Sequence, residues 1–219
     1  MVIAYWGKHN YRRGCTKVSS YISNKGKTTE ITLPELKPIT VFDFDNMLNT
    51  ISEINKSATA KDAVSTLISY IGNSLVSDYT SNGTSSTTSN TLSALKNKFR
   101  MGANAKIIYA SNGAEDWKEQ IYKELENNRP VLCRGNNAAG TGGHIFIVDG
   151  YDPETDKFHF NWGWGGSYDG WFDINILTPT STSNYSYKKA AIVGIQPDYK
   201  LGDTNNDGKI TVSDIMNII

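Results

Sequence analysis

The spacing of apolar residues changes near residue 130, and this change limits the possible folds more than any other feature of the sequence. Before that point, apolar residues recur every three or four positions, which is typical of helices with one buried face. Three such segments are expected: residues 59–76, a segment with Leu92, Leu95 and Phe99 on one side, and residues 116–127. After that point, short strands are expected over residues 130–134, 143–149, 157–162, 171–177 and 190–195. Helices followed by strands joined through Gly-, Asp- and Asn-rich turns predict an α+β fold with an antiparallel sheet.

Length and charge narrow the function classes. The chain has 219 residues, which suggests one domain and a small addition. Its 22 Lys and Arg balance its 22 Asp and Glu, so nothing indicates a nucleic acid or an anionic membrane surface as the main partner. No apolar run approaches the roughly 18 residues of a membrane span, and two cysteines cannot form a disulfide framework. The Ser/Thr/Asn-rich residues 80–91 predict a loop.

Both ends of the sequence have the pattern of interrupted elements. Residues 1–6 lack the basic and apolar regions of a signal peptide and resemble the last part of an amphipathic helix. At the other end, Ile218 and Ile219 lie within an apolar helical pattern that has no cap. We therefore expect a fragment of a longer protein.

A calcium-binding loop is expected near the C-terminus. Oxygen ligands at positions 1, 3, 5, 7 and 12 of an EF-hand loop would be Asp203, Asn205, Asp207, the backbone carbonyl of Lys209, and Asp214. Gly208 occupies position 6, where the loop turns sharply. A simple Asx-rich turn is the alternative. The short Asp214 and the preceding Leu201-Gly202 resemble the first repeat of a type I dockerin, so we divide the chain into residues 1–197 and a partial repeat at 198–219.

A second constellation centres on His144. Two glycines precede this histidine, which opens an apolar strand, and a hairpin would bring Asn161 beside it. An amide in that place can fix the imidazole tautomer, as the third member of a nucleophile–base–orienter triad does. Trp162 and Trp164 would shield the bond from water. The alternative is a packed or capping histidine beside a turn with core tryptophans.

These motifs resemble the streptopain family of papain-like cysteine peptidases. The segments that carry the resemblance are Gly142-Gly143-His144, Asp149-Gly150-Tyr151, residues 158–166 (FHFNWGWGG) and Asp169-Gly170-Trp171-Phe172. Weaker likeness extends over residues 1–197. The resemblance implies a papain-like fold with a helical part and an antiparallel sheet. It also implies that His144 is the general base supported by Asn161 and Trp162, and that Gly143 and Ser85 line the substrate cleft.

The nucleophile can be placed in two ways. Gly14-Cys15 imitates the Gly-Cys of the family, but a papain-type nucleophile begins a long helix whose N-terminus helps to hold the thiolate. Cys15 is instead followed by an alternating, strand-like stretch. We therefore expect the nucleophile upstream of Met1, with Cys15 as the alternative. Cys133, within an apolar strand, is expected to be a small core residue.

The expected function follows from the resemblance. It is a secreted or cell-surface bacterial cysteine endopeptidase that acts on proteins or peptides, represented here by an inactive fragment. One alternative is an inactive papain-fold binding module attached through its calcium repeat, and another is a papain-fold acyltransferase. Ca²⁺ is the expected ion, no cofactor is needed for catalysis, and a cohesin-like or cell-surface partner is expected for the repeat.

Overall fold

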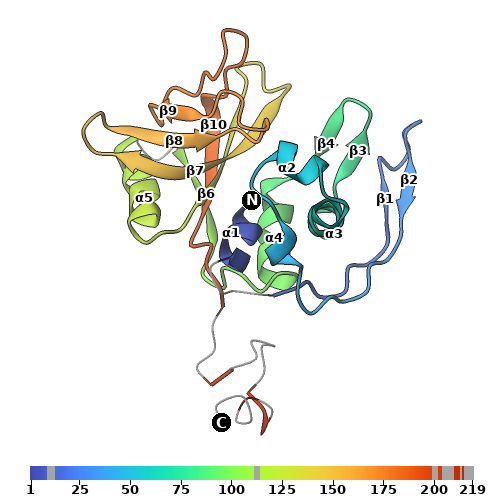
Figure 1. The fold of residues 1–219 in the computed structure, drawn as a ribbon. Helices are drawn as coiled ribbons and strands as arrows, with labels where there is room; N and C mark the ends of the chain where they lie inside the picture. Colours follow the sequence, from blue (N-terminus) through green and yellow to red (C-terminus); the bar gives the residue numbers. More distant parts are fainter. Residues whose placement is uncertain (9–12, 111–113, 199–201, 204–209, 213, 215–219) are drawn as a thin grey trace. The chain divides into compact units, whose positions relative to one another are not determined.

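A computed structural model describes residues 1–8, 13–110, 114–198, 202–203, 210–212 and 214 (Figure 1). The chain forms two compact units. The first contains residues 1–103 and 196–219, and the second contains residues 104–195. The C-terminal segment thus groups with the first unit, to which the Arg13–Asp203 ion pair connects it at 3.2 Å. The proposed boundary between residues 197 and 198 stays a prediction.

The first unit is mainly helical. Its helices are α1 (Val2–Lys8), the 3₁₀ turn η1 (Phe44–Asn46), α2 (Ile51–Asn55), α3 (Ala58–Ser74) and α4 (Thr88–Asn97). Its short hairpins pair β1 (Tyr21–Ser23) with β2 (Ile31–Leu33), and β3 (Asp78–Thr80) with β4 (Gly83–Ser85). The helical segments expected at residues 1–6 and 59–76 are confirmed as α1 and α3. On α3, Ala60, Ala63 and Leu67 are buried as the spacing predicts, whereas Ile68 is 61% exposed.

The prediction of a loop at residues 80–91 was wrong over much of its length. The β3–β4 hairpin occupies its first half, and α4 begins at Thr88. The reason is a helix cap, because the Thr87 hydroxyl accepts a hydrogen bond from the Asn90 N–H at 3.0 Å. A Ser/Thr-rich stretch therefore supplies the start of a helix here.

The second unit is one six-stranded antiparallel sheet with a helix, α5 (Ala114–Glu126), against it. The strand order is β5-β10-β6-β7-β8-β9. The strands are β5 (Lys106–Tyr109), β6 (Val131–Asn136), β7 (Gly143–Asp152), β8 (Lys157–Asn161), β9 (Gly170–Phe172) and β10 (Tyr187–Val193). The predicted α+β class and antiparallel sheet are confirmed.

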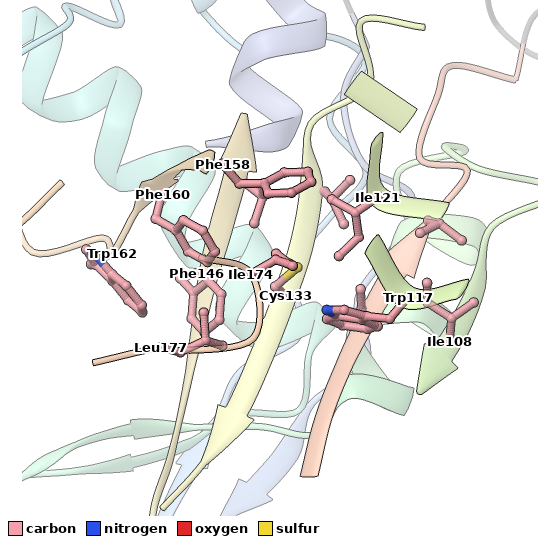
Figure 2. Close-up of a cluster of buried hydrophobic side chains, with 14 residues drawn as sticks. Ile108, Trp117, Ile121, Cys133, Phe146, Phe158, Phe160, Trp162, Ile174 and Leu177 are labelled. Carbon is pink, nitrogen blue, oxygen red and sulfur yellow. The ribbon is translucent and has the colours of Figure 1, made fainter. Parts of the chain in front are cut away.

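The core of this unit lies between α5 and one face of the sheet (Figure 2). Trp117 and Ile121 of α5, spaced by four residues, meet alternating side chains of the strands. The strand residues of this core include Val131, Cys133, Phe146, Val148, Phe158 and Phe160. Strand periodicity thus places residues of even number in β7 and β8 in the core, and His144 shares their parity.

One strand prediction was too long. Residues 171–177 form a strand only up to Phe172, after which the Asp173 carboxylate accepts a hydrogen bond from the Asn175 N–H at 2.7 Å. This Asx turn ends the strand. Ile174 and Leu177 are still buried, so their apolar character reflects the core and not a strand.

A charged cluster ties the end of α5 to the sheet. The Arg129 guanidinium donates from Nε and Nη2 to the two oxygens of Glu124 at 2.8 and 2.9 Å. The N–H of Gly194, which follows β10, donates to the same carboxylate at 2.7 Å. Burial raises the pKa of Glu124, but these hydrogen bonds outweigh burial and lower the pKa below its ordinary value.

Among the described helices, none is both long and apolar enough to cross a bilayer.

Candidate active site

His144 lies near the start of β7 and is held by a backbone carbonyl. Its Nε2 lies 2.7 Å from the carbonyl oxygen of Trp162. A carbonyl can only accept a hydrogen bond, so Nε2 carries the proton in this contact. In the neutral ring Nδ1 then holds the lone pair, and no described residue forms a hydrogen bond with it. The site therefore presents Nδ1 as the basic nitrogen.

Asn161 acts on His144 through one peptide group. Its Oδ1 accepts the N–H of Gly163 at 3.0 Å. That N–H belongs to the same peptide unit as the Trp162 carbonyl, which receives the His144 proton. The expected direct contact between the Asn161 amide and the imidazole is therefore not formed. A chain of two hydrogen bonds replaces it, and each bond polarises the other.

Two further features fix the orientation of this peptide. The Asp169 carboxylate accepts the N–H of Trp162 at 2.9 Å. Gly163 has φ +77°, a conformation that residues with a side chain adopt at a cost. Because of the turn at Gly163, the chain reverses after β8 while the Trp162 carbonyl still faces His144.

Aromatic rings surround the imidazole. The centroids of Trp164 and Tyr185 lie 4.9 and 5.3 Å from that of His144, and those of Phe146 and Trp162 lie 6.3 and 6.4 Å away. Trp162 is fully buried, whereas Trp164 is half-buried. This enclosure reduces competition from water for the Nε2 hydrogen bond. The expectation that the tryptophans shield His144 agrees with this geometry.

The loop before His144 is organised by Asn137. Its Oδ1 accepts the N–H of Thr141 at 3.1 Å and that of Gly142 at 3.4 Å, and its Nδ2 donates to the Thr141 hydroxyl at 3.2 Å. Gly143 follows, where an added Cβ would lie only 3.0 Å from the Gly135 carbonyl oxygen. The close pairing of β6 and β7 thus favours glycine at this position.

The two residues expected to line a cleft belong to different units. Gly143 is exposed at the start of β7 in the second unit, and Ser85 is exposed at the end of β4 in the first. Their role toward a substrate stays a prediction.

Neither cysteine has the surroundings of a nucleophile. Cys15 is buried in an extended segment that pairs with Ile39, and its Sγ lies 3.7 Å from the Ser74 hydroxyl. Burial raises the pKa of this thiol, which disfavours the thiolate. Cys133 lies fully inside the core of the second unit, where burial also raises its pKa strongly. The expectation that Cys133 is a core residue is confirmed.

The predicted calcium loop is described only at its ends. Asp203 is buried and paired with Arg13. Asp214 is buried as well, and its Oδ2 accepts the N–H of Thr211 at 2.7 Å. Asn205, Asp207 and Lys209 lie outside the described residues. The ends of the loop thus supply two carboxylates, each engaged with a group of the chain.

A second histidine on the same sheet has a different partner. His159 Nδ1 lies 2.6 Å from Asp149 Oδ1, and about a third of each side chain is exposed. The carboxylate can only accept, so Nδ1 donates here. Trp171 contacts this ring edge-on at a centroid distance of 5.2 Å.

Several positioning groups were missing from the sequence interpretation. The Trp162 carbonyl is part of the backbone and leaves no signal in the residue types. Asp169 and Tyr185 lie 7 and 23 residues beyond Trp162, and only the fold brings them to the site. Gly163 was the available signal, because a glycine between two tryptophans suggests a constrained peptide.

Comparisons with known proteins identify the family of the chain. The model of the peptidase C10 family matches residues 2–172. Streptopain of Streptococcus pyogenes is 34% identical over 163 residues, which cover 71% of this chain and 40% of streptopain. The thiol protease/hemagglutinin PrtT of Porphyromonas gingivalis is 40% identical over 111 residues, or 48% of this chain and 12% of that protein.

The fold is also similar to a solved structure. Active wild-type interpain A, a cysteine protease of Prevotella intermedia, superposes with a TM-score of 0.76 at 25% identity, covering 89% of this chain and 79% of that one. The chain spans about 40% of the length of the streptopains it matches. The family model, the sequence relatives and the fold agree, and the chain belongs to the peptidase C10 family.

Proposed function

We propose that the protein to which this chain belongs is a cysteine endopeptidase that hydrolyses peptide bonds in proteins. The observation that supports it most is the orientation of His144, whose Nε2–H donates to the Trp162 carbonyl and whose Nδ1 is thereby left as the base. Family membership and the thiol proteases among the relatives support the same reaction. Secretion or exposure at a bacterial surface is part of this proposal.

In the proposed reaction, Nδ1 of His144 takes the proton of a cysteine thiol. The thiolate attacks the peptide carbonyl, and the imidazolium then gives its proton to the departing amine. Nδ1 next removes a proton from water as the water attacks the thioester; the C–S bond breaks, the carboxylic acid leaves, and the proton on Nδ1 returns to the cysteine thiolate. Asn161 and the Trp162 carbonyl would keep the proton on Nε2 in place throughout. Gly143 and Ser85 are proposed to contact the substrate.

The nucleophilic cysteine is proposed to lie outside residues 1–219. The sequence has two cysteines, and both thiols are buried with raised pKa values. We propose that α1 is the C-terminal end of the helix that would carry the nucleophile. Residues 1–219 alone are therefore expected to be inactive.

Labelling with an epoxide inhibitor of thiol proteases tests this proposal. Residues 1–219 should show no adduct and no turnover of casein, and the Cys15→Ser variant should behave identically. The natural full-length polypeptide should be labelled once, at a cysteine outside this range. An adduct on Cys15 would contradict the placement of the nucleophile. A full-length polypeptide that is neither labelled nor active would favour the alternative, an inactive papain-fold binding module.

We also propose that residues 203–214 bind one Ca²⁺. The donor set Asp203, Asn205, Asp207, the Lys209 carbonyl and Asp214 consists of oxygens only, which suits this ion. Both carboxylates at the ends of the loop are buried, where a cation would offset their charge. A cohesin-like or cell-surface partner is the proposed use of this repeat.

Calorimetric titration can test the calcium proposal on residues 1–219. We expect a dissociation constant of about 10⁻⁴–10⁻³ M, because the short Asp214 replaces a bidentate Glu. Release of Asp203 from Arg13 would weaken binding further. Asp203→Ala should remove the binding heat, and Mg²⁺ should give little. Equal heats for the original chain and Asp203→Ala at millimolar calcium would mean that the segment is only a polar turn.

A further inference from the structure

A cavity of about 550 Å³ opens at one end of the six-stranded sheet, within the second unit. Its lining residues are Tyr109, Ala110, Arg134, Ser186, Lys188 and Lys189. Three of these six residues are cationic and none is acidic. The cavity has no part in the chemistry proposed for His144, so its charge calls for a separate explanation.

The strand register explains why the cavity exists. Ala190 of β10 lies directly opposite Tyr109 of β5 on one side and Arg134 of β6 on the other. Opposed residues point to the same face of a sheet, so two large side chains flank one methyl group. The register of β10 shifts between Tyr187 and Ala190, and Lys188 in this bulge has φ +44°. The bulge brings two consecutive lysines to the cavity.

Two of the three cations have no counter-charge among the residues that the structure describes. The Nε of Arg134 is buried and has no hydrogen-bond partner, and no described residue forms an ion pair with its guanidinium. Lys188 likewise has no ion pair or hydrogen bond from its ammonium among the described residues, and it is exposed. Lys189 is different, because its Nζ donates to the Ile174 carbonyl at 3.2 Å and to Asn175 Oδ1 at 3.0 Å. It forms a fixed part of the wall.

Neutral donors complete the cavity. The Ser186 oxygen accepts the N–H of Leu177 at 2.9 Å, which leaves its own O–H to donate. Tyr109 is 53% exposed and brings a phenol to the rim. An Arg, a Lys and hydroxyl donors that line one cavity match the oxygens of a tetrahedral anion, because guanidinium binds such oxygens in pairs.

We propose that this cavity binds a tetrahedral oxyanion, either inorganic phosphate or sulfate or the same group carried as a monoester. Arg134 and Lys188 bind the charge, and Ser186 donates a hydrogen bond to one oxygen. The inference is independent of the proposed peptidase activity, since it requires neither a nucleophile nor His144.

The cavity is connected to the surroundings of His144. Ser186 follows Tyr185, whose ring lies 5.3 Å from the imidazole. On the other side, a Cβ added to Gly140 would lie 3.8 Å from Lys188 Nζ, so this ammonium borders the loop that leads to His144. Binding of an anion should therefore change the environment of the His144 ring.

Titration of residues 1–219 with sodium phosphate and sodium sulfate at constant ionic strength tests the proposal. We expect saturable binding with a dissociation constant of the order of 1 mM, accompanied by a shift of the His144 ring signals in NMR spectra. Arg134→Gln and Lys188→Gln should each weaken binding about tenfold or more, as the loss of one charged hydrogen bond predicts. Lys157→Gln, an exposed lysine of β8, is the matched control and should bind normally.

The outcomes separate the sources of the anion. Phenyl phosphate that binds more tightly than inorganic phosphate indicates a monoester, and equal or weaker binding indicates the free ion. Lys188 is exposed, so Lys188→Gln keeps the test valid if Arg134→Gln fails to fold. The absence of saturable binding up to about 50 mM, or unchanged binding by a folded Lys188→Gln, would overturn the proposal.

Discussion

Two histidines on neighbouring strands of one sheet differ in the ring nitrogen that donates, in its acceptor and in their surroundings. His144 on β7 donates from Nε2 to a backbone carbonyl and lies among aromatic rings. His159 on β8 donates from Nδ1 to the Asp149 carboxylate, and about a third of its side chain is exposed. By residue type, the His–Asp pair resembles a catalytic dyad more closely. The surroundings favour His144, because only there does one fixed tautomer occur in an enclosed site.

The difference shows how the proposed general base is held in one orientation. At the partly exposed His159–Asp149 contact, water competes for the hydrogen bond. The Trp162 carbonyl belongs to a peptide that Asn161 and Asp169 fix from both sides. Enclosure and a fixed backbone acceptor therefore define one geometry for His144, whereas His159 has a partly exposed hydrogen bond to Asp149.

Replacing each histidine by alanine should change the rate of peptide hydrolysis very differently. In the full-length polypeptide, His144→Ala should lower the rate of peptide hydrolysis about 10²–10⁴-fold, because general-base catalysis is lost. His159→Ala should leave the rate within about twofold of the original, because His159 neither acts as the proposed base nor contacts His144. Steady-state assays with both variants check this. Comparable losses of rate in the two variants would mean that His159 matters to the reaction as much as His144.

A second variant changes the charged cluster at the ends of α5 and β10. Glu124→Gln removes the charge from the hydrogen bonds with Arg129 and Gly194 and should lower the free energy of unfolding by about 2 kcal/mol at pH 7. The pKa of Glu124 is lowered in the folded state, so its contribution is present above the unfolded value of about 4.3 and is lost as the pH falls through the lower folded value.

Denaturant unfolding, followed by tryptophan fluorescence between pH 7 and pH 3, measures this difference. The gap between the original chain and Glu124→Gln should narrow below about pH 4. A gap independent of pH would mean that the carboxylate is not the source of the stabilisation.

A smaller effect is expected at Asn161. Asn161→Ala removes the acceptor for the Gly163 N–H and should slow hydrolysis about two- to tenfold, which corresponds to one hydrogen bond. Asn161→Asp keeps the acceptor and should recover most of the rate. If Asn161→Asp were as slow as Asn161→Ala, the amide N–H₂ would be the important group, as in the direct contact that the sequence suggested.

The smallest effect is expected at the surface pair. Asp149→Asn should change the free energy of unfolding by less than about 1 kcal/mol, because both side chains are partly exposed. Thermal unfolding of residues 1–219 with and without this substitution measures the change, and peptide hydrolysis by the full-length polypeptide should not alter. A large loss of activity would bring His159 into the mechanism.

The sequence predicted long, periodic elements well and short ones poorly. Helices α3 and α5 and strands β6, β7, β8 and β10 have enough apolar residues for their period to be read. Strand β5 and the three-residue strands β1 to β4 have too few apolar residues to show a period, and the register of their pairing depends on the rest of the fold. The strand expected beyond Phe172 was an error of the same kind. Ile174 is apolar because it is buried in the core, and in the sequence it looked like a strand residue.

The sequence indicated which segments gather around His144 but not the bonds between them. The structure brings the glycines before His144 and the motif after Asn161 together, and their role in catalysis stays a prediction. A bond to a backbone carbonyl cannot be inferred from residue types, because every residue has one. The direct His144–Asn161 contact was the simpler inference, and the turn at Gly163 inserts a peptide group between the two side chains.

The tautomers of the two histidines show directly whether the Trp162 carbonyl holds the His144 ring. In residues 1–219 labelled with ¹⁵N, the two-bond ¹⁵N–¹H correlations of each ring show which nitrogen carries the proton, at a pH of about 8.5 where ordinary imidazoles are neutral. We predict opposite results: a proton on Nε2 of His144 and a proton on Nδ1 of His159. A proton on Nδ1 of His144, or an even mixture of its two tautomers, would mean that the Trp162 carbonyl does not fix this ring.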